Sequence, residues 1–138
     1  MILSVTLNPS VDRTLFVDGL KPHDANRVQA VETDAGGKGL NLSRIARRMG
    51  GETCALAFLG GSTGDLIQSV LQREDVALHA VRVTGENRLN VTVEDRTGAP
   101  PTSFNERGPQ VTAENWADFL ATFEKLAQGV EWVSIGGS

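Results

Sequence analysis

The sequence predicts an α/β fold, in which helices cover a parallel sheet and a smaller sheet of half-exposed strands forms a flap beside it. Apolar segments alternate with segments of helical periodicity, which is the βαβα order of right-handed crossover units. Residues 53–59, TCALAFL, form an uninterrupted apolar run that is typical of a central parallel strand covered on both faces. Residues 88–94 alternate between polar and apolar side chains, as a strand with one exposed face does.

The composition of the 138 residues is that of one ordinary globular domain, with 40% hydrophobic and 22% charged residues. No apolar run approaches the ~18 residues of a membrane span. Met1 leads directly into a strand-like segment, so we expect no membrane segment, no signal peptide and a cytoplasmic location. The formal net charge of −4 argues against a nucleic-acid partner, and we interpret Arg44, Arg47 and Arg48 as a solvated helix face. Cys54 has no CxxC partner, which predicts a small buried residue.

The first strand is expected at Ile2–Leu7, and it ends in the turn-rich segment NPSVD. This places Asp12 just past the carboxyl end of a strand, where ligands bind in open α/β sheets. A role in capping the turn alone is the alternative for Asp12. Extended segments follow at Arg13–Val17 and Arg27–Val31, and their mixture of polar and apolar side chains predicts half-exposed strands.

The segment Asp34–Gly51, DAGGKGLNLSRIARRMGG, combines a glycine-rich turn with an amphipathic helix. Its glycines allow backbone N–H groups to approach a ligand closely, and Lys38 adds a positive charge. An anion site at the N-terminus of this helix is one interpretation, and a simple tight turn is the other. A Walker A loop is excluded, because Gly39 follows Lys38 where that motif requires Ser or Thr.

The remaining elements follow from periodicity and turn signals. The buried stripe of the helix after Gly39 is expected to consist of Leu42, Ile45, Ala46 and Met49. Further on we predict a helix at Gly64–Glu74, a strand at Leu78–Val83 and a hairpin from residues 88–94 back to Thr102–Asn105. A helix capped by Thr112 carries an apolar stripe from Trp116 to Leu126, and a strand at Val130–Ile135 runs into Gly136-Gly137-Ser138. A helix should follow such a glycine turn, so we expect the fold to be cut within a unit.

The sequence gives little support for a metal site or for a catalytic nucleophile. His23 and His79 are isolated from other ligand-type residues, and no GxSxG segment or cysteine with a suitable base is present, so no metal ligand is predicted. Arg88 lies on the polar side of an alternating strand and would by default be a surface residue.

Several segments, taken together and in this order, resemble the PfkB/ribokinase family of carbohydrate kinases. They are TLNPSVD (6–12), AGGKGLNLSRIARRMGG (35–51), FLGGSTGD (58–65), NRLNV (87–91), NERGP (105–109) and SIGGS (134–138). The resemblance covers nearly the whole chain and is greatest to the 1-phosphofructokinase and tagatose-6-phosphate kinase branch.

The resemblance implies a ribokinase-like three-layer sandwich, with a parallel sheet, flanking helices and a small β-sheet lid. The lid strands would lie at about residues 13–18, 27–33, 88–94 and 101–105. It also implies substrate-binding roles: Asp12 for sugar hydroxyls, Gly37 and Asn41 for the sugar, Lys38 for its phosphate, Arg27 and Arg88 as a phosphate clamp, and Ser138 beside the sugar.

Family members are much longer than this chain. The resemblance therefore implies that residues 1–138 are the N-terminal part of a single ribokinase-like domain, truncated before its C-terminal half. The nucleotide-binding half and the catalytic base would lie beyond Ser138, so no catalytic residue is expected in this chain and the chain alone should be inactive. An exposed apolar edge at residues 130–135 would favour self-association.

The implied activity is transfer of the γ-phosphoryl group of ATP, with Mg²⁺, to a hydroxyl of fructose 1-phosphate. Tagatose 6-phosphate, an unphosphorylated sugar or a nucleoside are alternative acceptors, and a non-catalytic sugar-phosphate-binding module is an alternative from another class. A homodimer through the lid is also implied, with Phe16, Leu89, Val91 and Val93 as its apolar side.

Overall fold

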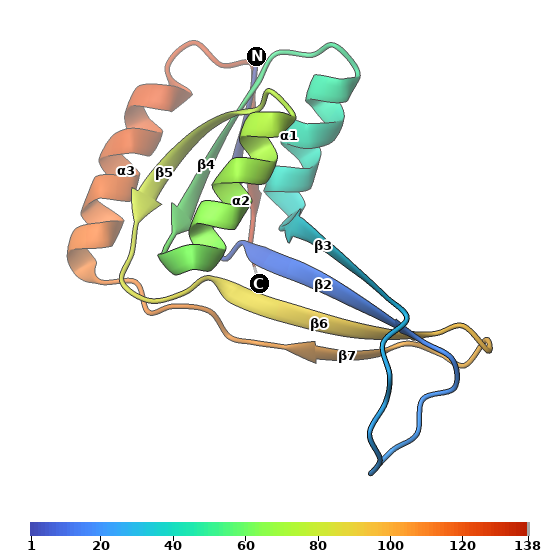
Figure 1. The fold of residues 1–138 in the computed structure, drawn as a ribbon. Coiled ribbons are helices and arrows are strands. Elements are labelled where there is room, and N and C mark those ends of the chain that lie inside the picture. Colours follow the sequence, from blue (N-terminus) through green and yellow to red (C-terminus); the bar gives the residue numbers. More distant parts are fainter. Residues whose placement is uncertain (138) are drawn as a thin grey trace.

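A computed structural model describes residues 1–137 as two four-stranded sheets and three helices (Figure 1). The main sheet has the order β5-β4-β1-β8 and is parallel throughout. Its strands are β1 (Ile2–Thr6), β4 (Thr53–Leu59), β5 (Ala77–Arg82) and β8 (Trp132–Gly136). The second sheet, which we call the lid, has the order β3-β2-β6-β7 and extends from the carboxyl ends of the main strands (Figure 1). Its strands are β2 (Ser10–Val17), β3 (Ala30–Gly36), β6 (Arg88–Asp95) and β7 (Thr102–Asn105).

Helices cover both faces of the main sheet, and strand β4 shows the resulting two cores. Its residues 55, 57 and 59 pack in one cluster with Leu40 of helix α1 (Lys38–Arg48) and Ile67 of helix α2 (Gly61–Arg73). Its residues 54, 56 and 58 pack in a second cluster with Phe119 of helix α3 (Ala113–Ala127). All seven β4 residues are buried, which confirms the predicted central strand. Burial raises the pKa of the Cys54 thiol, and the predicted small buried cysteine is confirmed.

The helix after the glycine turn begins where predicted but packs on a different face. Ile45 is 55% exposed and Met49 is 82% exposed, so the expected apolar stripe is wrong. The buried residues are instead Leu40, Ser43 and Arg44, together with Gly39. The Ser43 hydroxyl lies 2.7 Å from that of Ser4 and 2.6 Å from that of Thr53, so hydrogen bonding rather than apolar periodicity decides which face is inside.

The lid strands differ from their predicted limits at two places. Strand β2 begins at Ser10, opposite both Gly36 of β3 and Arg88 of β6, so Asp12 lies within a strand and not in a turn. Strand β3 begins only at Ala30, because the preceding residues form a loop in which Asn26 hydrogen bonds to the backbone N–H and C=O of Lys21.

The strand register assigns each lid residue to one of two faces. Leu15 pairs with Val93 and Val31, and Val91 pairs with Phe104, which makes one face apolar. Phe16 pairs with Glu94 on the other, polar face, so its predicted place beside Leu89, Val91 and Val93 is wrong. Successive side chains of a strand point to opposite faces of the sheet, so Phe16 cannot share the apolar face with its neighbour Leu15.

Helix α3 begins where its local capping signal predicts, whereas helix α2 does not begin where predicted. Thr112 caps α3, and its side chain and that of Asn115 form a capping box, as the Thr112 signal predicts. Phe119 is the buried member of the α3 stripe, whereas Trp116 and Leu120 remain 39% and 54% exposed. Helix α2 begins at Gly61, three residues earlier than predicted.

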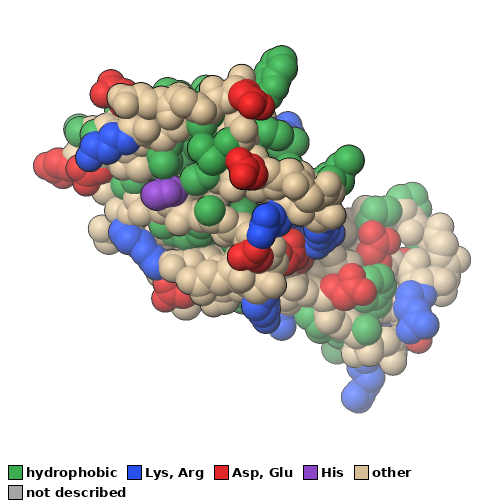
Figure 2. Space-filling model, turned by 90° about the horizontal axis from the view of Figure 1, so that it is seen from above, with side chains coloured by type: hydrophobic (Ala, Val, Ile, Leu, Met, Phe, Trp, Pro, Cys, Tyr) green, Lys and Arg blue, Asp and Glu red, His purple; other side chains and the backbone are tan. Residues whose placement is uncertain are grey.

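Strand β8 lies at the edge of the main sheet and pairs with β1. Trp132 and Ile135 of this strand are 72% and 65% exposed. Within residues 1–137, no helix is long and apolar enough to cross a membrane. Acidic, basic and apolar side chains are interspersed over the face drawn in Figure 2, which carries no single basic patch.

Candidate functional site

A pocket of about 180 Å³ lies where the lid meets the carboxyl ends of β1 and β8. Carboxylate, amide, hydroxyl and cationic side chains line it together with backbone glycines. The lining residues are Thr6, Asn8, Ser10, Asp12, Gly37, Lys38, Asn41, Arg88, Asn90, Gly136 and Gly137. A larger hollow of about 590 Å³ lies near Met1 and Ala77, at the amino ends of the strands. The smaller pocket is the better candidate, because parallel α/β sheets bind ligands at their carboxyl edge.

Gly37 connects the lid to helix α1 in a conformation that requires glycine. Its φ is 127°, and a Cβ at this position would lie 2.7 Å from Cγ2 of Thr6. The helix that follows has no acidic residue in its first turn, and the Leu40 N–H donates to the Thr6 hydroxyl at 3.0 Å. The N-terminus of α1, with Lys38 as its first residue, therefore presents positive potential to the pocket.

Asp12 is held by two donors inside the pocket. The Ser10 hydroxyl donates to its Oδ1 at 2.7 Å, and Nδ2 of Asn90 donates to the same oxygen at 3.0 Å. A Cβ on Gly36 would collide with the Asp12 carboxylate and with Oγ of Ser10, so this glycine is required by close packing. The carboxylate is thereby fixed at the junction between the lid and the glycine turn.

Arg88 is the first residue of β6, and its Nε donates to the backbone oxygen of Asn8 at 3.2 Å. The preceding residue anchors it: Asn87 is 1% exposed, accepts from the Gly60 N–H at 2.9 Å and donates to the Phe58 oxygen at 3.0 Å. The start of the lid strand is thus attached to the end of β4.

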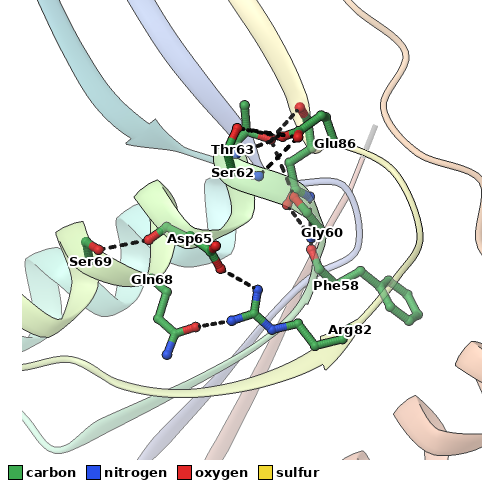
Figure 3. A network of polar contacts seen from close by, with 10 residues as sticks. Phe58, Gly60, Ser62, Thr63, Asp65, Gln68, Ser69, Arg82 and Glu86 are labelled. Atoms are coloured by element: carbon green, nitrogen blue, oxygen red, sulfur yellow. Dashed lines mark hydrogen bonds and ion pairs between the residues drawn. The ribbon is translucent and has the colours of Figure 1, made fainter.

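Glu86 adds a second attachment next to this one. Its carboxylate accepts hydrogen bonds from the backbone N–H groups and the hydroxyls of Ser62 and Thr63 (Figure 3). The N–H of Thr63 is the main cause that lowers the Glu86 pKa to about 2. Glu86 therefore caps α2 from 23 residues away in sequence, which explains the early start of that helix.

Arg44 connects the lid to both helices on one face, and sequence analysis missed this role. Its guanidinium contacts Asp34 at 2.9 Å, Glu74 at 2.6 Å and the backbone oxygen of Ala35 at 3.0 Å. It is only 8% exposed, so the prediction that Arg44 belongs to a solvated face is wrong. Hydrogen bonding to Glu74 raises the pKa of Arg44, and hydrogen bonding to Arg44 lowers the pKa of Glu74 to about 2.

The structure brings together five of the residues expected to bind substrate: Asp12, Gly37, Lys38, Asn41 and Arg88. Arg27 lines a different hollow, beside Lys21 and Asn26 at the far end of the lid. Ser138 lies outside the described residues. Ser10 and Asn90 also line the pocket, although no local sequence motif marks them; their only signal is their strand position, opposite Gly36 and Asp12 respectively.

These groups divide chemically into two sets. Asp12 and the amides of Asn41 and Asn90 suit hydroxyl groups, since each offers a hydrogen-bond acceptor. Lys38, Arg88 and the N-terminus of α1 suit an anion. The pocket can therefore hold a ligand that carries both hydroxyl groups and a negative charge.

Comparison with known proteins agrees with this chemistry. The model of the pfkB family carbohydrate kinases matches residues 5–138. A candidate phosphofructokinase from Staphylococcus aureus is 31% identical with a TM-score of 0.86, over 100% of this chain and 44% of that chain. A possible 1-phosphofructokinase from Thermotoga maritima is 29% identical with a TM-score of 0.89, over 97% and 43% of the two chains. Phosphofructokinase-2 from Escherichia coli, solved with substrates and products, is 25% identical with a TM-score of 0.90, over 99% and 44%. The chain thus spans less than half the length of these structures.

Proposed function

The chain belongs to the pfkB family of carbohydrate kinases, and from this premise we propose that its pocket binds the acceptor of an ATP-dependent sugar-phosphate kinase. The acceptor that we propose is fructose 1-phosphate, one hydroxyl of which would receive the γ-phosphoryl group of ATP. The chain has the ribokinase-like arrangement of a parallel sheet between helices with a small second sheet, as the sequence predicted.

One observation carries the proposal: Asp12, Lys38 and Arg88 line the same pocket. The Asp12 carboxylate accepts hydrogen bonds from sugar hydroxyls. The Lys38 ammonium is a compact charge and the Arg88 guanidinium is a planar fork, and both suit the oxygens of a phosphate ester. A sugar without a phosphate group would leave Lys38 and Arg88 with no anion to bind.

The names of similar structures support a phosphorylated ketohexose. One is described as a possible 1-phosphofructokinase and another as phosphofructokinase-2. Tagatose 6-phosphate is the second candidate acceptor, since it presents the same combination of phosphate and hydroxyls. A nucleoside or an unphosphorylated sugar fits the cationic side chains less well. A non-catalytic sugar-phosphate-binding module would use the same pocket without phosphoryl transfer.

ATP and Mg²⁺ are the proposed cofactors of the kinase. Among residues 1–137, no group of three or more His, Cys, Asp and Glu side chains is arranged to hold a metal ion, so we assign Mg²⁺ to no described residue. The role of these residues is to bind and orient the acceptor, and positioning is a large part of catalysis in phosphoryl transfer.

We expect no turnover by residues 1–138 alone, because the base that the family resemblance implies is not among them. A coupled assay with ATP, Mg²⁺ and fructose 1-phosphate checks this, and turnover well above the blank would contradict it.

Substitution of Lys38 tests the acceptor assignment. We expect Lys38→Ala to weaken fructose 1-phosphate binding roughly 10-fold or more, because a hydrogen bond to a charged group contributes about 1.5–3 kcal/mol. Binding of unphosphorylated fructose should not change. Chemical-shift titration of the chain by NMR measures both ligands, even when affinity is weak.

Lys125→Ala is the matched control, because Lys125 lies in the last turn of α3, away from the pocket. It should leave both affinities unchanged. An equal loss for fructose and fructose 1-phosphate in the Lys38 variant would refute a phosphate-binding role. Unchanged affinity for both ligands would favour an unphosphorylated acceptor.

A further inference from the structure

We propose that Asn90 is a sugar-recognition residue, whose side-chain oxygen accepts a hydrogen bond from one hydroxyl of the bound sugar phosphate. This inference rests on the proposed function of the pocket. It assigns a specificity-determining role to a lid residue that stands directly opposite Asp12.

The position of Asn90 places it on the polar face of the lid. It pairs with Asp12 of β2 on one side and with Asn105 of β7 on the other, and its side chain lines the candidate pocket. Its Nδ2 donates to Oδ1 of Asp12 at 3.0 Å. Asn90 is therefore in direct contact with the carboxylate that the proposal assigns to sugar hydroxyls.

The contact with Asp12 also fixes the orientation of the amide. An ionised carboxylate can only accept hydrogen bonds, so the amide nitrogen must be the atom that faces it. The amide oxygen is consequently directed elsewhere. That oxygen, Oδ1, is buried and has no hydrogen-bond partner among residues 1–137.

A buried acceptor without a partner destabilises the chain, because it has lost its hydrogen bonds to water and gained none in return. The cost is offset if a ligand supplies a donor. The phosphate group of the ligand is excluded from this position, since the adjacent Asp12 carboxylate would repel its oxygens. The hydroxyls of the proposed sugar phosphate are its remaining hydrogen-bond donors, so a sugar hydroxyl is the group that takes this place.

Asp12 and Asn90 then act as a pair of neighbouring acceptors. Both hydrogen bonds that Asp12 receives from Ser10 and Asn90 end on Oδ1, so its Oδ2 is the atom available for one hydroxyl. Oδ1 of Asn90 takes a second hydroxyl. Lys38 and Arg88 hold the phosphate of the same molecule, which sets the direction in which the sugar lies.

The experiment compares ligands that differ by one hydroxyl. NMR titration of the wild-type chain and of Asn90→Ala would use fructose 1-phosphate, its monodeoxy analogues and inorganic phosphate. We expect Asn90→Ala to weaken binding of fructose 1-phosphate about 5- to 150-fold, which corresponds to the loss of one buried hydrogen bond at about 1–3 kcal/mol. One monodeoxy analogue should bind equally well to both chains, and inorganic phosphate should be unaffected.

Two further variants separate recognition from a structural role. Asn90→Thr retains a hydroxyl that can donate to Asp12 and has high strand propensity, so it should fold normally and show the same selective loss. Asn105→Ala removes the exposed asparagine opposite Asn90 and should leave all affinities unchanged.

The outcomes distinguish this inference from the function on which it rests. Equal losses of affinity for every monodeoxy analogue would show that Asn90 only positions Asp12, and would overturn the inference. No loss for any ligand would overturn it as well. If the wild-type chain binds fructose 1-phosphate no better than inorganic phosphate, the proposed function itself fails.

Discussion

Arg44 shows how one side chain links the lid to the body of the molecule. Its guanidinium hydrogen bonds to Asp34 and to the Ala35 oxygen at the end of β3, and to Glu74 just after α2. It also approaches Oδ1 of Asn41 in the pocket, at 3.4 Å. Removal of one partner of a buried ion pair is costly, because the remaining charge stays desolvated. The network therefore stabilises the junction on which the pocket is built.

Glu74 makes this network sensitive to acid. Its pKa falls from 4.5 to about 2 in the folded chain, chiefly because it accepts hydrogen bonds from Arg44. Since the folded pKa lies below the unfolded one, the stabilisation is present above about pH 4.5 and is lost as the pH falls toward 2. We expect Glu74→Gln to lower the melting temperature at neutral pH and to reduce its decline over this acidic range. Thermal unfolding followed by circular dichroism between pH 2 and 7 would measure both effects.

Glu124→Gln provides the comparison, because Glu124 is exposed on α3 and should show neither effect. A Glu74 variant with wild-type stability at neutral pH and the same acid dependence would contradict a stabilising role for the ion pair.

At the scale of elements, the sequence alone was sufficient to predict a helix or strand wherever residues close together in the chain determine its structure. The apolar run of β4 and the Thr112 cap of α3 both lie where predicted, since burial on two faces and a capping hydroxyl leave local patterns. The pairing of the alternating strand β6 with β7 is confirmed for the same reason.

Elements determined by distant partners were not predictable. Helix α2 begins early because Glu86, 23 residues away, binds its N-terminus. Helix α1 turns Ser43 and Arg44 inward because Ser4, Thr53 and Glu74 supply their partners. The contacts of Ser43 with Ser4, of Arg44 with Glu74 and of Thr63 with Glu86 join residues 39, 30 and 23 positions apart, so a local stretch of sequence contains only one of the two partners. The position of Asp12 within β2 likewise depends on pairing with β3 and β6.

The same distinction applies to the candidate site. The glycine turn, Lys38 and Asn41 are contiguous in sequence, so one segment predicted them together. Asn90 reaches the pocket only through the register of β6 against β2, and no local feature of the sequence marks it.

At the scale of the whole molecule, two exposed apolar surfaces stand out, one on each sheet. One is the apolar face of the lid, where Val31 is 47% exposed and Phe104 is 62% exposed. The other is the edge strand β8, with Trp132 and Ile135. Exposed apolar patches and unpaired strand edges both favour association. We propose that the lid face forms a homodimer and that the β8 edge causes weaker, open-ended association.

Two single substitutions separate these surfaces. Phe104→Glu should convert a dimer to a monomer in sedimentation velocity, because it replaces a strongly exposed apolar side chain of the lid face by a charge. Ile135→Glu should leave the dimer intact and reduce larger species, since a charge on an edge strand opposes further pairing. A wild-type chain that sediments as a single monomeric species would contradict both expectations.

The parallel pairing of β2 with β6 sets the order in which the pocket can form. Asp12 and Asn90 meet across this pair although they are 78 residues apart in the chain. Closing so long a loop must precede the contacts that stabilise it, so this step is expected to be slow compared with formation of the helices. A chain emerging from the ribosome holds Asp12 and Lys38 long before Asn90 exists, and the binding pocket is completed only once β6 and then β8, which carries Gly136, have been made. Recovery of ligand affinity during refolding would therefore report on these long-range pairings rather than on early collapse.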